Sequence, residues 1–284
     1  MILSSLTEWG PAGAWLAAPE RQGLVMPSVL ALAGYLVAAW PGQAAAQRSA
    51  LLAAWLLHAL AILADVFDAG GAGTGARFGF APALSATAWM VLAVYTVESR
   101  FAPQVGVRRV LALLGAAVVV LAVLFPGNVR TQAGSPWAPV HWVLGLASYG
   151  LFGAAVLHAA LLGRADHALR PTPGHAAAAL GEGGLGLPLL KLERLTFQFV
   201  AAGFGVLSAA LLLGWWFSAA WRWDHKAVLS VLSWLVFAAL LLGRYRFGWR
   251  GARALRWLYS GAALLLLAYV GSRFVFEVLL RRPA

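Results

Sequence analysis

The chain has 284 residues, and 62% of them are apolar even before its 31 glycines are counted, whereas soluble domains reach about 45–50% with glycine included. Only 11% of the residues are charged, and 21 Lys and Arg against 10 Asp and Glu give a net charge of +11. The basic residues form short clusters between long apolar runs, a pattern typical of loops beside a bilayer, so the composition excludes soluble enzymes, disordered tails and nucleic-acid-binding modules. The chain has no cysteine, which excludes disulfides, iron–sulfur clusters and thiolate metal sites.

Eight apolar stretches are long enough to cross the hydrocarbon core of a membrane, which takes about 17–25 helical residues. They cover approximately 24–40, 49–66, 80–97, 109–125, 140–163, 195–219, 226–243 and 255–279. Unsatisfied backbone groups are costly in lipid, so these stretches should be helices. We therefore expect an all-α integral membrane protein, a bundle of about eight transmembrane helices in a single membrane domain over residues 1–284. The first stretch lacks a positively charged segment before it, which favours a retained helix over a cleaved signal peptide.

Lysine and arginine are unevenly divided between the two sides of the predicted bundle. Loops on one side carry thirteen of them, and loops on the other side carry seven. Because cytoplasmic loops are the richer in Lys and Arg, both termini are expected on the outer side, which is the periplasm in a Gram-negative cell. The longest connection, residues 164–194, is then a cytoplasmic loop, and residues 187–199 could form an interfacial helix that leads into the sixth span.

Histidines inside the spans are the first candidates for chemistry. His58 lies near the middle of the second span, where it could be an axial ligand of a metal cofactor such as heme, a proton relay, or a partner in a helix–helix hydrogen bond. His141 begins the fifth span between Trp137 and Trp142, so it is either a ligand or part of the aromatic belt at the membrane surface. His158 is 17 residues further along the same helix, about 25 Å away, and cannot share a site with His141.

Tryptophan is concentrated at the outer end of the sixth span and in the short loop after it. Residues 214–226 read Gly-Trp-Trp-Phe-Ser-Ala-Ala-Trp-Arg-Trp-Asp-His-Lys, with four tryptophans among nine residues. An aromatic belt needs only one or two rings per helix, so this density favours a binding platform. Tryptophans could pack on the flat apolar face of a porphyrin, while Arg222 or Lys226 pairs with its propionates.

The run Trp221-Arg222-Trp223-Asp224 resembles the ending of the tryptophan-rich segment of cytochrome c assembly proteins of the CcsA type, and Trp234 resembles the tryptophan that closes it. The similarity is greatest to the short, eight-span branch of YpjD-like inner-membrane proteins. Further matching blocks run in order through most of the chain from the second span onward: HALAIL around His58, VHWVLGLASYGLF at His141, LERLTF, HKAVLSVLSWLVF, RFGWRG and AYVGSRFV.

The resemblance implies a multi-pass protein of the bacterial inner membrane that binds or handles heme during cytochrome c biogenesis. His58 resembles the family's in-membrane histidine and His141 its outer-side histidine, so both are expected as ligands of the heme iron. The core of the periplasmic segment is expected to present the heme. The residues expected to contact the cofactor are His58, His141, Trp221, Arg222, Trp223, Asp224, His225 and Lys226.

Departures from the family pattern reduce the ligand set. Ser218 stands where family members usually have glycine, and His225-Lys226-Ala227 replaces a frequent Pro-Lys-Glu. The segment YVGSRFVFEVLL lacks the second outer-side histidine of full-length members, and Gly243-Arg244-Tyr245 replaces an inner-side one. Half of the family's four histidines are therefore present. This fits a single heme, a transient heme contact, or a descendant that kept the fold and lost the ligand, and His225 could be a local substitute.

The leading hypothesis is an assembly factor or heme-handling subunit rather than a stand-alone enzyme. The thioether-forming cysteines must come from an apocytochrome c, since this chain has none. The expected partners are therefore the lipid bilayer, a periplasmic assembly partner and apocytochrome c. Nucleic acid is not expected as a partner. One alternative is a permease or ion-homeostasis protein of the same fold, which would need a polar path through the bundle. Another is a regulatory scaffold that binds a cytoplasmic partner through residues 164–194 and 244–256.

Overall fold

The computed structural model describes residues 22–66, 75–99, 105–126, 128–131, 137–169, 189–217 and 223–280. These residues form α2 (Gln22–Ala39), α3 (Ala44–Val66), β1 (Gly75–Phe78), α4 (Phe80–Glu98), α5 (Val105–Leu124), β2 (Asn128–Thr131), α6 (Ala138–Leu169), α7 (Leu189–Phe217), α8 (His225–Phe247), α9 (Gly251–Leu266), η3 (Leu267–Gly271), α10 (Ser272–Phe274) and η4 (Val275–Leu279). Seven helices in the described part of the chain are long and apolar enough to cross a membrane, and Val25–Ala39 within α2 is a shorter apolar helix. The expected all-α membrane fold is confirmed.

Two helices are longer than the apolar runs that predict them. The structure extends α6 to Leu169 and begins α7 at Leu189, so both reach into the predicted loop 164–194. Their extra turns carry charged residues, which lower the hydropathy without breaking a helix. Pro171 and Pro188 stand just beyond the two ends, where proline disfavours a continued helix. The rest of that connection, residues 170–188, lies outside the described residues.

The chain divides into two compact units, of which the first comprises residues 1–85 and 109–133. Within it α2 packs closely on α3, because Gly34 leaves no room for a side chain: an added Cβ would lie 2.9 Å from the Cβ of Ala54. Small residues of this kind let membrane helices approach closely. The strands β1 and β2 pair antiparallel, with Gly75 opposite Thr131, and add a short two-stranded element that the hydropathy pattern did not predict.

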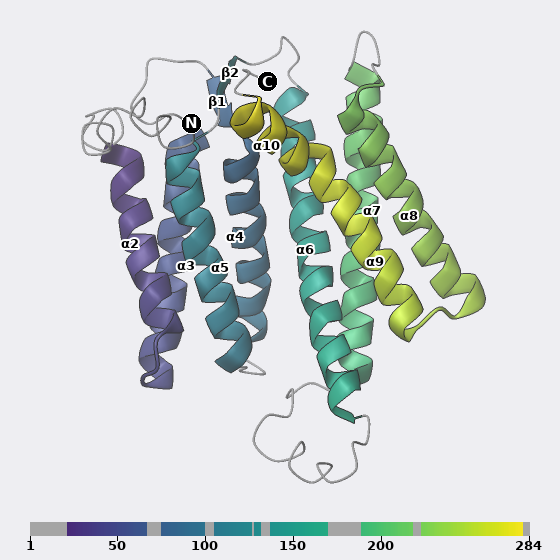
Figure 1. Cartoon of the computed structure of the whole chain (residues 1–284), viewed down its shortest axis with the longest axis horizontal. Helices are drawn as coiled ribbons and strands as arrows, with labels where there is room; N and C mark the ends of the chain where they lie inside the picture. Colours follow the sequence, from purple (N-terminus) through teal and green to yellow (C-terminus); the bar gives the residue numbers. More distant parts are fainter. Residues whose placement is uncertain are drawn as a thin grey trace. The chain divides into compact units, whose positions relative to one another are not determined.

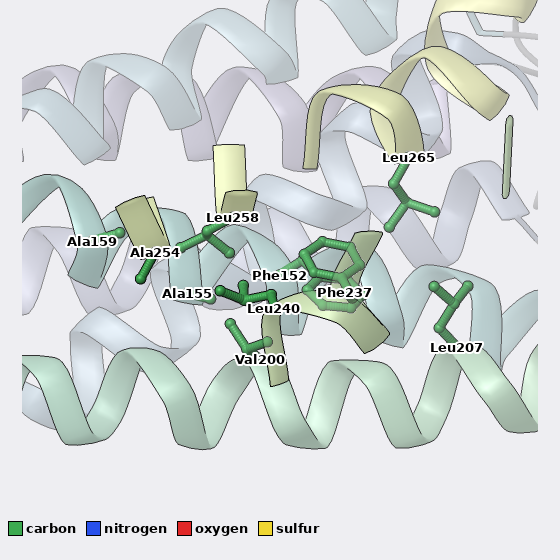
Figure 2. Close-up of a cluster of buried hydrophobic side chains, with 10 residues drawn as sticks. All are labelled: Phe152, Ala155, Ala159, Val200, Leu207, Phe237, Leu240, Ala254, Leu258 and Leu265. Carbon is green, nitrogen blue, oxygen red and sulfur yellow. The ribbon is translucent and has the colours of Figure 1, made fainter. Parts of the chain in front are cut away.

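The second unit comprises residues 86–108 and 134–284. In Figure 1 its helices α6, α7 and α8 run side by side, while α9 crosses them diagonally and leads into α10. Their shared core is drawn in Figure 2, where Phe152 of α6 and Phe237 of α8 stack with ring centroids 3.8 Å apart. The hydroxyl of Ser233 donates a hydrogen bond to the carbonyl of Gly261 over 2.9 Å, which joins α8 to α9. This core holds the helices that carry most of the candidate site residues.

The last helix changes its winding near its end. Regular α9 continues into the π-helical segment η3, then a short α-helical turn, α10, and then the π-helical segment η4. The hydroxyl of Tyr149 in α6 donates a hydrogen bond to the carbonyl of Leu265, just before the first π segment. A side chain therefore supports the backbone where the regular pattern of helical hydrogen bonds changes.

Candidate functional site

His141 lies in the first turn of α6 and contacts α7 through its ring. Its Nδ1 donates a hydrogen bond to the carbonyl of Ala210 over 2.9 Å. Because a carbonyl only accepts, Nδ1 carries the proton, and the lone pair of the neutral imidazole is then on Nε2. Histidines that bind metals commonly orient their ring in this way, with the second nitrogen donating to a carbonyl.

The contact between His141 and α7 depends on Gly214. A Cβ added at Gly214 would lie 2.9 Å from Cε1 of His141 and 3.2 Å from Nδ1. Only glycine lets the imidazole lie this close to the backbone of α7. The sequence gives one signal for this residue, because Gly214 directly precedes the Trp215-Trp216 pair.

Exposed indole rings just before α6 and at the end of α7 lie near His141. Trp137 is one turn before it in the chain, and the backbone N–H of His141 donates to the carbonyl of Trp137 over 3.0 Å. The Trp137 ring lies 5.7 Å from the ring of Trp216, tilted by 50°. Trp215 beside it is also exposed. The structure thus brings Trp216, which is far away in the sequence, next to the segment that carries Trp137 and His141.

The tryptophan-rich segment leads directly into α8. Trp221 and Arg222 lie outside the described residues. Trp223 is exposed, and the Asp224 carboxylate accepts a hydrogen bond from the backbone N–H of Ala227 over 2.9 Å. Asp224 is therefore the N-cap of α8, which gives the W-x-W-D ending a structural role in fixing where the helix begins.

The residues after the cap contact the end of the last helix. The His225 ring lies 5.5 Å from the ring of Phe276, and the Lys226 ammonium lies 5.9 Å from the ring of Tyr269. The guanidinium of Arg273 lies 5.6 Å from the same Tyr269 ring. The start of α8 and the segment from η3 to η4 therefore form one aromatic and basic cluster.

His58 has a different environment in the first unit. It is fully buried, its Nδ1 lies 2.9 Å from the hydroxyl of Tyr35, and its Nε2 lies 2.7 Å from Oγ of Ser85. A neutral imidazole donates from one nitrogen and accepts at the other, so both nitrogens have hydroxyl partners. The ring joins α2, α3 and α4. Iron ligation by His58 would require one of these hydroxyls to be released.

His158 and Glu98 form a pair in the second unit that sequence reasoning did not find. Nδ1 of His158 donates to the carbonyl of Ala154 over 2.8 Å, and Nε2 lies 2.9 Å from Oε2 of Glu98. The two residues are 60 positions apart, so no local pattern indicates the contact. Among the described residues, no group of three or more His, Asp or Glu side chains is arranged to hold a metal ion.

Comparison with known proteins identifies the family of the chain. The family model described as "Cytochrome C assembly protein" matches residues 44–280. The chain is 32% identical over 163 residues to the inner membrane protein YpjD of Escherichia coli (strain K12), a match that covers 56% of this chain and 60% of that protein. It is 35% identical over 160 residues to an uncharacterized 28.8 kDa protein of Azospirillum brasilense, which covers 54% of this chain and 56% of that protein.

A longer match links the chain to the proteins named for cytochrome c biogenesis. It is 26% identical over 248 residues to the cytochrome c biogenesis protein CcsA of Gloeobacter violaceus, covering 66% of this chain and 72% of that protein. No solved structure matches the chain. The match to YpjD spans about three fifths of that protein's length. The membrane-spanning helices and this relative make the chain a multi-pass inner-membrane protein. Because the family match runs from residue 44 to residue 280, the chain belongs to the cytochrome c assembly protein family.

Proposed function

We propose that this protein handles heme during the assembly of c-type cytochromes and that His141 binds the heme iron through Nε2. The observation that carries this proposal is the hydrogen bond from Nδ1 of His141 to the carbonyl of Ala210. That bond fixes the ring orientation and the tautomer that iron binding needs. The family of the chain and the indole rings beside His141 add support.

The tryptophans supply the apolar part of the proposed heme site. Trp137, Trp215 and Trp216 present exposed rings on the same end of α6 and α7, and we place Trp221 and Trp223 with them as faces for the porphyrin. Arg222 and Lys226 would pair with the propionates. His225 follows Asp224 directly and is the candidate for a second ligand on this side. Asp224 acts indirectly, because it caps α8 and so positions its neighbours.

The contacts of His58 support a helix-joining role more than iron ligation. Both of its ring nitrogens already lie within 2.9 Å of a hydroxyl oxygen, and exchanging one bond for iron would leave a buried hydroxyl to find another partner. We therefore place the heme contact at His141. His58 would bind the iron as a second ligand only in a state in which its hydrogen bond to Tyr35 or to Ser85 is broken.

The unequal charge of the loops supports the proposed orientation. With thirteen Lys and Arg residues on one side and seven on the other, residues 1–284 form one membrane domain with both termini and the tryptophan-rich segment in the periplasm. Residues 164–194 then lie in the cytoplasm. An apocytochrome c supplies the cysteines that this chain lacks, so the protein acts with a periplasmic assembly partner, as an assembly factor rather than a stand-alone enzyme.

The visible absorption spectrum tests the proposal. The purified protein in detergent, titrated with hemin, should develop a Soret band that His141→Ala weakens and that added imidazole partly restores. His175→Ala is the matched control, because it removes a histidine from the 170–188 connection, and it should leave the band unchanged. A wild-type preparation that stays colourless with hemin, or an H141A spectrum equal to that of the wild type, would show that the proposal is wrong.

A further inference from the structure

A second candidate site lies at the other end of the second unit. The start of α7, the end of α8 and the turn before α9 line a cavity of about 470 Å³. Its charged lining residues are Glu193, Arg194, Arg244 and Arg250, and Phe197 is the aromatic one. Glu193 and Gly214 lie at opposite ends of α7, about 30 Å apart at 1.5 Å per residue. This cavity is therefore separate from the proposed heme site.

The cavity carries an excess of positive charge. Nη1 of Arg244 lies 2.5 Å from Oε1 of Glu193, and Nε of Arg250 lies 3.4 Å from the same oxygen. Arg194 makes no ion pair with any residue that the structure describes. Three arginines and one carboxylate thus line the cavity. The Arg250 side chain is 66% exposed while that of Glu193 is only 15% exposed, so the arginines, and not the acid, are the groups that a ligand meets first.

Arg244 is held in place before any ligand arrives. Its guanidinium lies 4.4 Å above the ring of Phe197, and Nη1 also donates to the carbonyl of Trp249 over 3.2 Å. Both of its hydrogen bonds within the described residues use Nη1, which leaves the N–H groups of Nε and Nη2 as donors for a ligand. A planar guanidinium of this kind matches two oxygens of a phosphate.

The turn that carries Arg250 is also fixed. Gly248 ends α8 in the left-handed conformation, with φ 62°, a conformation that glycine adopts without the steric penalty of a side chain. The backbone N–H of Trp249 donates to the carbonyl of Gly243 over 3.1 Å. A Cβ at Gly243 would lie 2.4 Å from the Trp249 ring, so the indole packs directly on the helix backbone. These contacts, within residues 243–250, set the position of Arg250.

The position of the cavity along α7 matches the headgroup layer of a bilayer. The apolar segment Leu189–Trp216 has 28 residues, which is about 42 Å of helix against about 30 Å of hydrocarbon. With this excess shared between the two ends, the first turn lies beyond the hydrocarbon. Glu193 and Arg194 in the second turn then lie at its boundary, from which a long arginine side chain can reach the lipid phosphates. Further along α7, Phe197 and Ala201 line the same cavity. The lining thus changes from basic to apolar in the direction of the hydrocarbon, as a lipid changes from phosphate to acyl chain.

We propose that this cavity binds an anionic phospholipid, with its phosphate among Arg194, Arg244 and Arg250 and an acyl chain along Phe197 and Ala201. Basic pockets between transmembrane helices are suited to such headgroups. The proposal does not rest on the heme-handling function, since none of its residues contacts the proposed heme site.

A lipid titration followed by native mass spectrometry tests this site. The protein in neutral detergent is titrated with dioleoylphosphatidylglycerol, with dioleoylphosphatidylcholine and with inorganic phosphate. Phosphatidylglycerol should bind more tightly than either of the others. The double variant Arg194→Gln with Arg250→Gln should lower its affinity about tenfold to thirtyfold, because each arginine contributes about 1 kcal/mol near a phosphate.

The matched control removes the same charge from the same end of the unit. Arg246 and Arg256 are exposed residues outside the cavity lining, and changing both to Gln should leave the affinity within about twofold, since exposed charges at a distance are screened. An equal loss in this control would overturn the proposal, because the attraction would then be diffuse. Equal binding of phosphatidylcholine, or of inorganic phosphate, would overturn the assignment to an anionic lipid.

Discussion

Replacing Gly214 with alanine tests how the helix packing positions His141. The added carbon would lie 2.9 Å from Cε1 and 3.2 Å from Nδ1 of the imidazole, whereas nonbonded carbon atoms pack at about 3.5–4.0 Å. The ring must therefore move by about half an ångström or more. That movement stretches the 2.9 Å bond from Nδ1 to the carbonyl of Ala210 beyond the usual limit of about 3.2 Å.

The energies for this substitution nearly cancel in the folded protein. Loss of the hydrogen bond costs about 1 kcal/mol, and alanine in place of glycine within a helix returns up to about 1 kcal/mol. The free energy of unfolding should change little. Hemin affinity should nevertheless fall about tenfold to a hundredfold, the usual effect of losing the group that orients a metal-binding histidine.

Hemin titration and thermal unfolding of the same detergent samples separate these two effects. Gly205→Ala is the matched control on α7, because nothing lies within 4 Å of an added Cβ there. It should stabilise the helix by up to about 1 kcal/mol and leave the Soret band unchanged. Wild-type hemin affinity in G214A, or an equal loss in G205A, would refute the reasoning.

Two other substitutions test single contacts. Asp224→Ala removes the N-cap of α8 and should lower the free energy of unfolding by about 1 kcal/mol, while Asp224→Asn should leave that free energy unchanged because asparagine caps equally well. Thermal unfolding of both variants measures the difference. Equal melting temperatures of D224A and the wild type would exclude a capping role. Tyr35→Phe removes the hydroxyl partner of a fully buried His58 nitrogen and should cost about 1–3 kcal/mol without changing the hemin spectrum. Tyr245→Phe is its control, because this tyrosine is 87% exposed and such changes stay within about 0.5 kcal/mol. Because Y35F releases Nδ1 of His58 from its hydroxyl partner, a Soret band that shifts or strengthens in Y35F alone would instead make His58 part of the heme site.

Apolar run length is enough to predict the helices, because a membrane imposes one length and one kind of backbone pairing on every span. It does not predict where α6 ends or where α7 begins, since the turns there contain charged residues that still form helix. The short β1–β2 pair falls between spans, where hydropathy gives no signal. The two π-helical segments also leave no trace in composition, because the residues of η3 and η4 suit either winding.

The candidate site was predictable in its parts but not in its contacts. His141 and the tryptophans are visible as residue types at the ends of spans. The acceptor for His141 is the backbone carbonyl of Ala210, 69 positions away, and a carbonyl belongs to every residue and so carries no sequence signal. The hydroxyl partners of His58 and the pairing of His158 with Glu98 likewise depend on the register between helices, which no local pattern records.

The π-helical segments change how the end of the chain responds to insertions and deletions. Each π turn accommodates about one residue more than an α turn, so it rotates everything after it by roughly 100° relative to a regular helix. Downstream of η3 this rotation directs Arg273 inward, where it is only 2% exposed. A one-residue deletion inside Leu267–Gly271 could restore regular winding without breaking the helix. It would remove the extra residue together with the rotation that it causes, so Arg273 would stay on its buried face, whereas a one-residue deletion within regular α9 would turn Arg273 by about 100° away from that face.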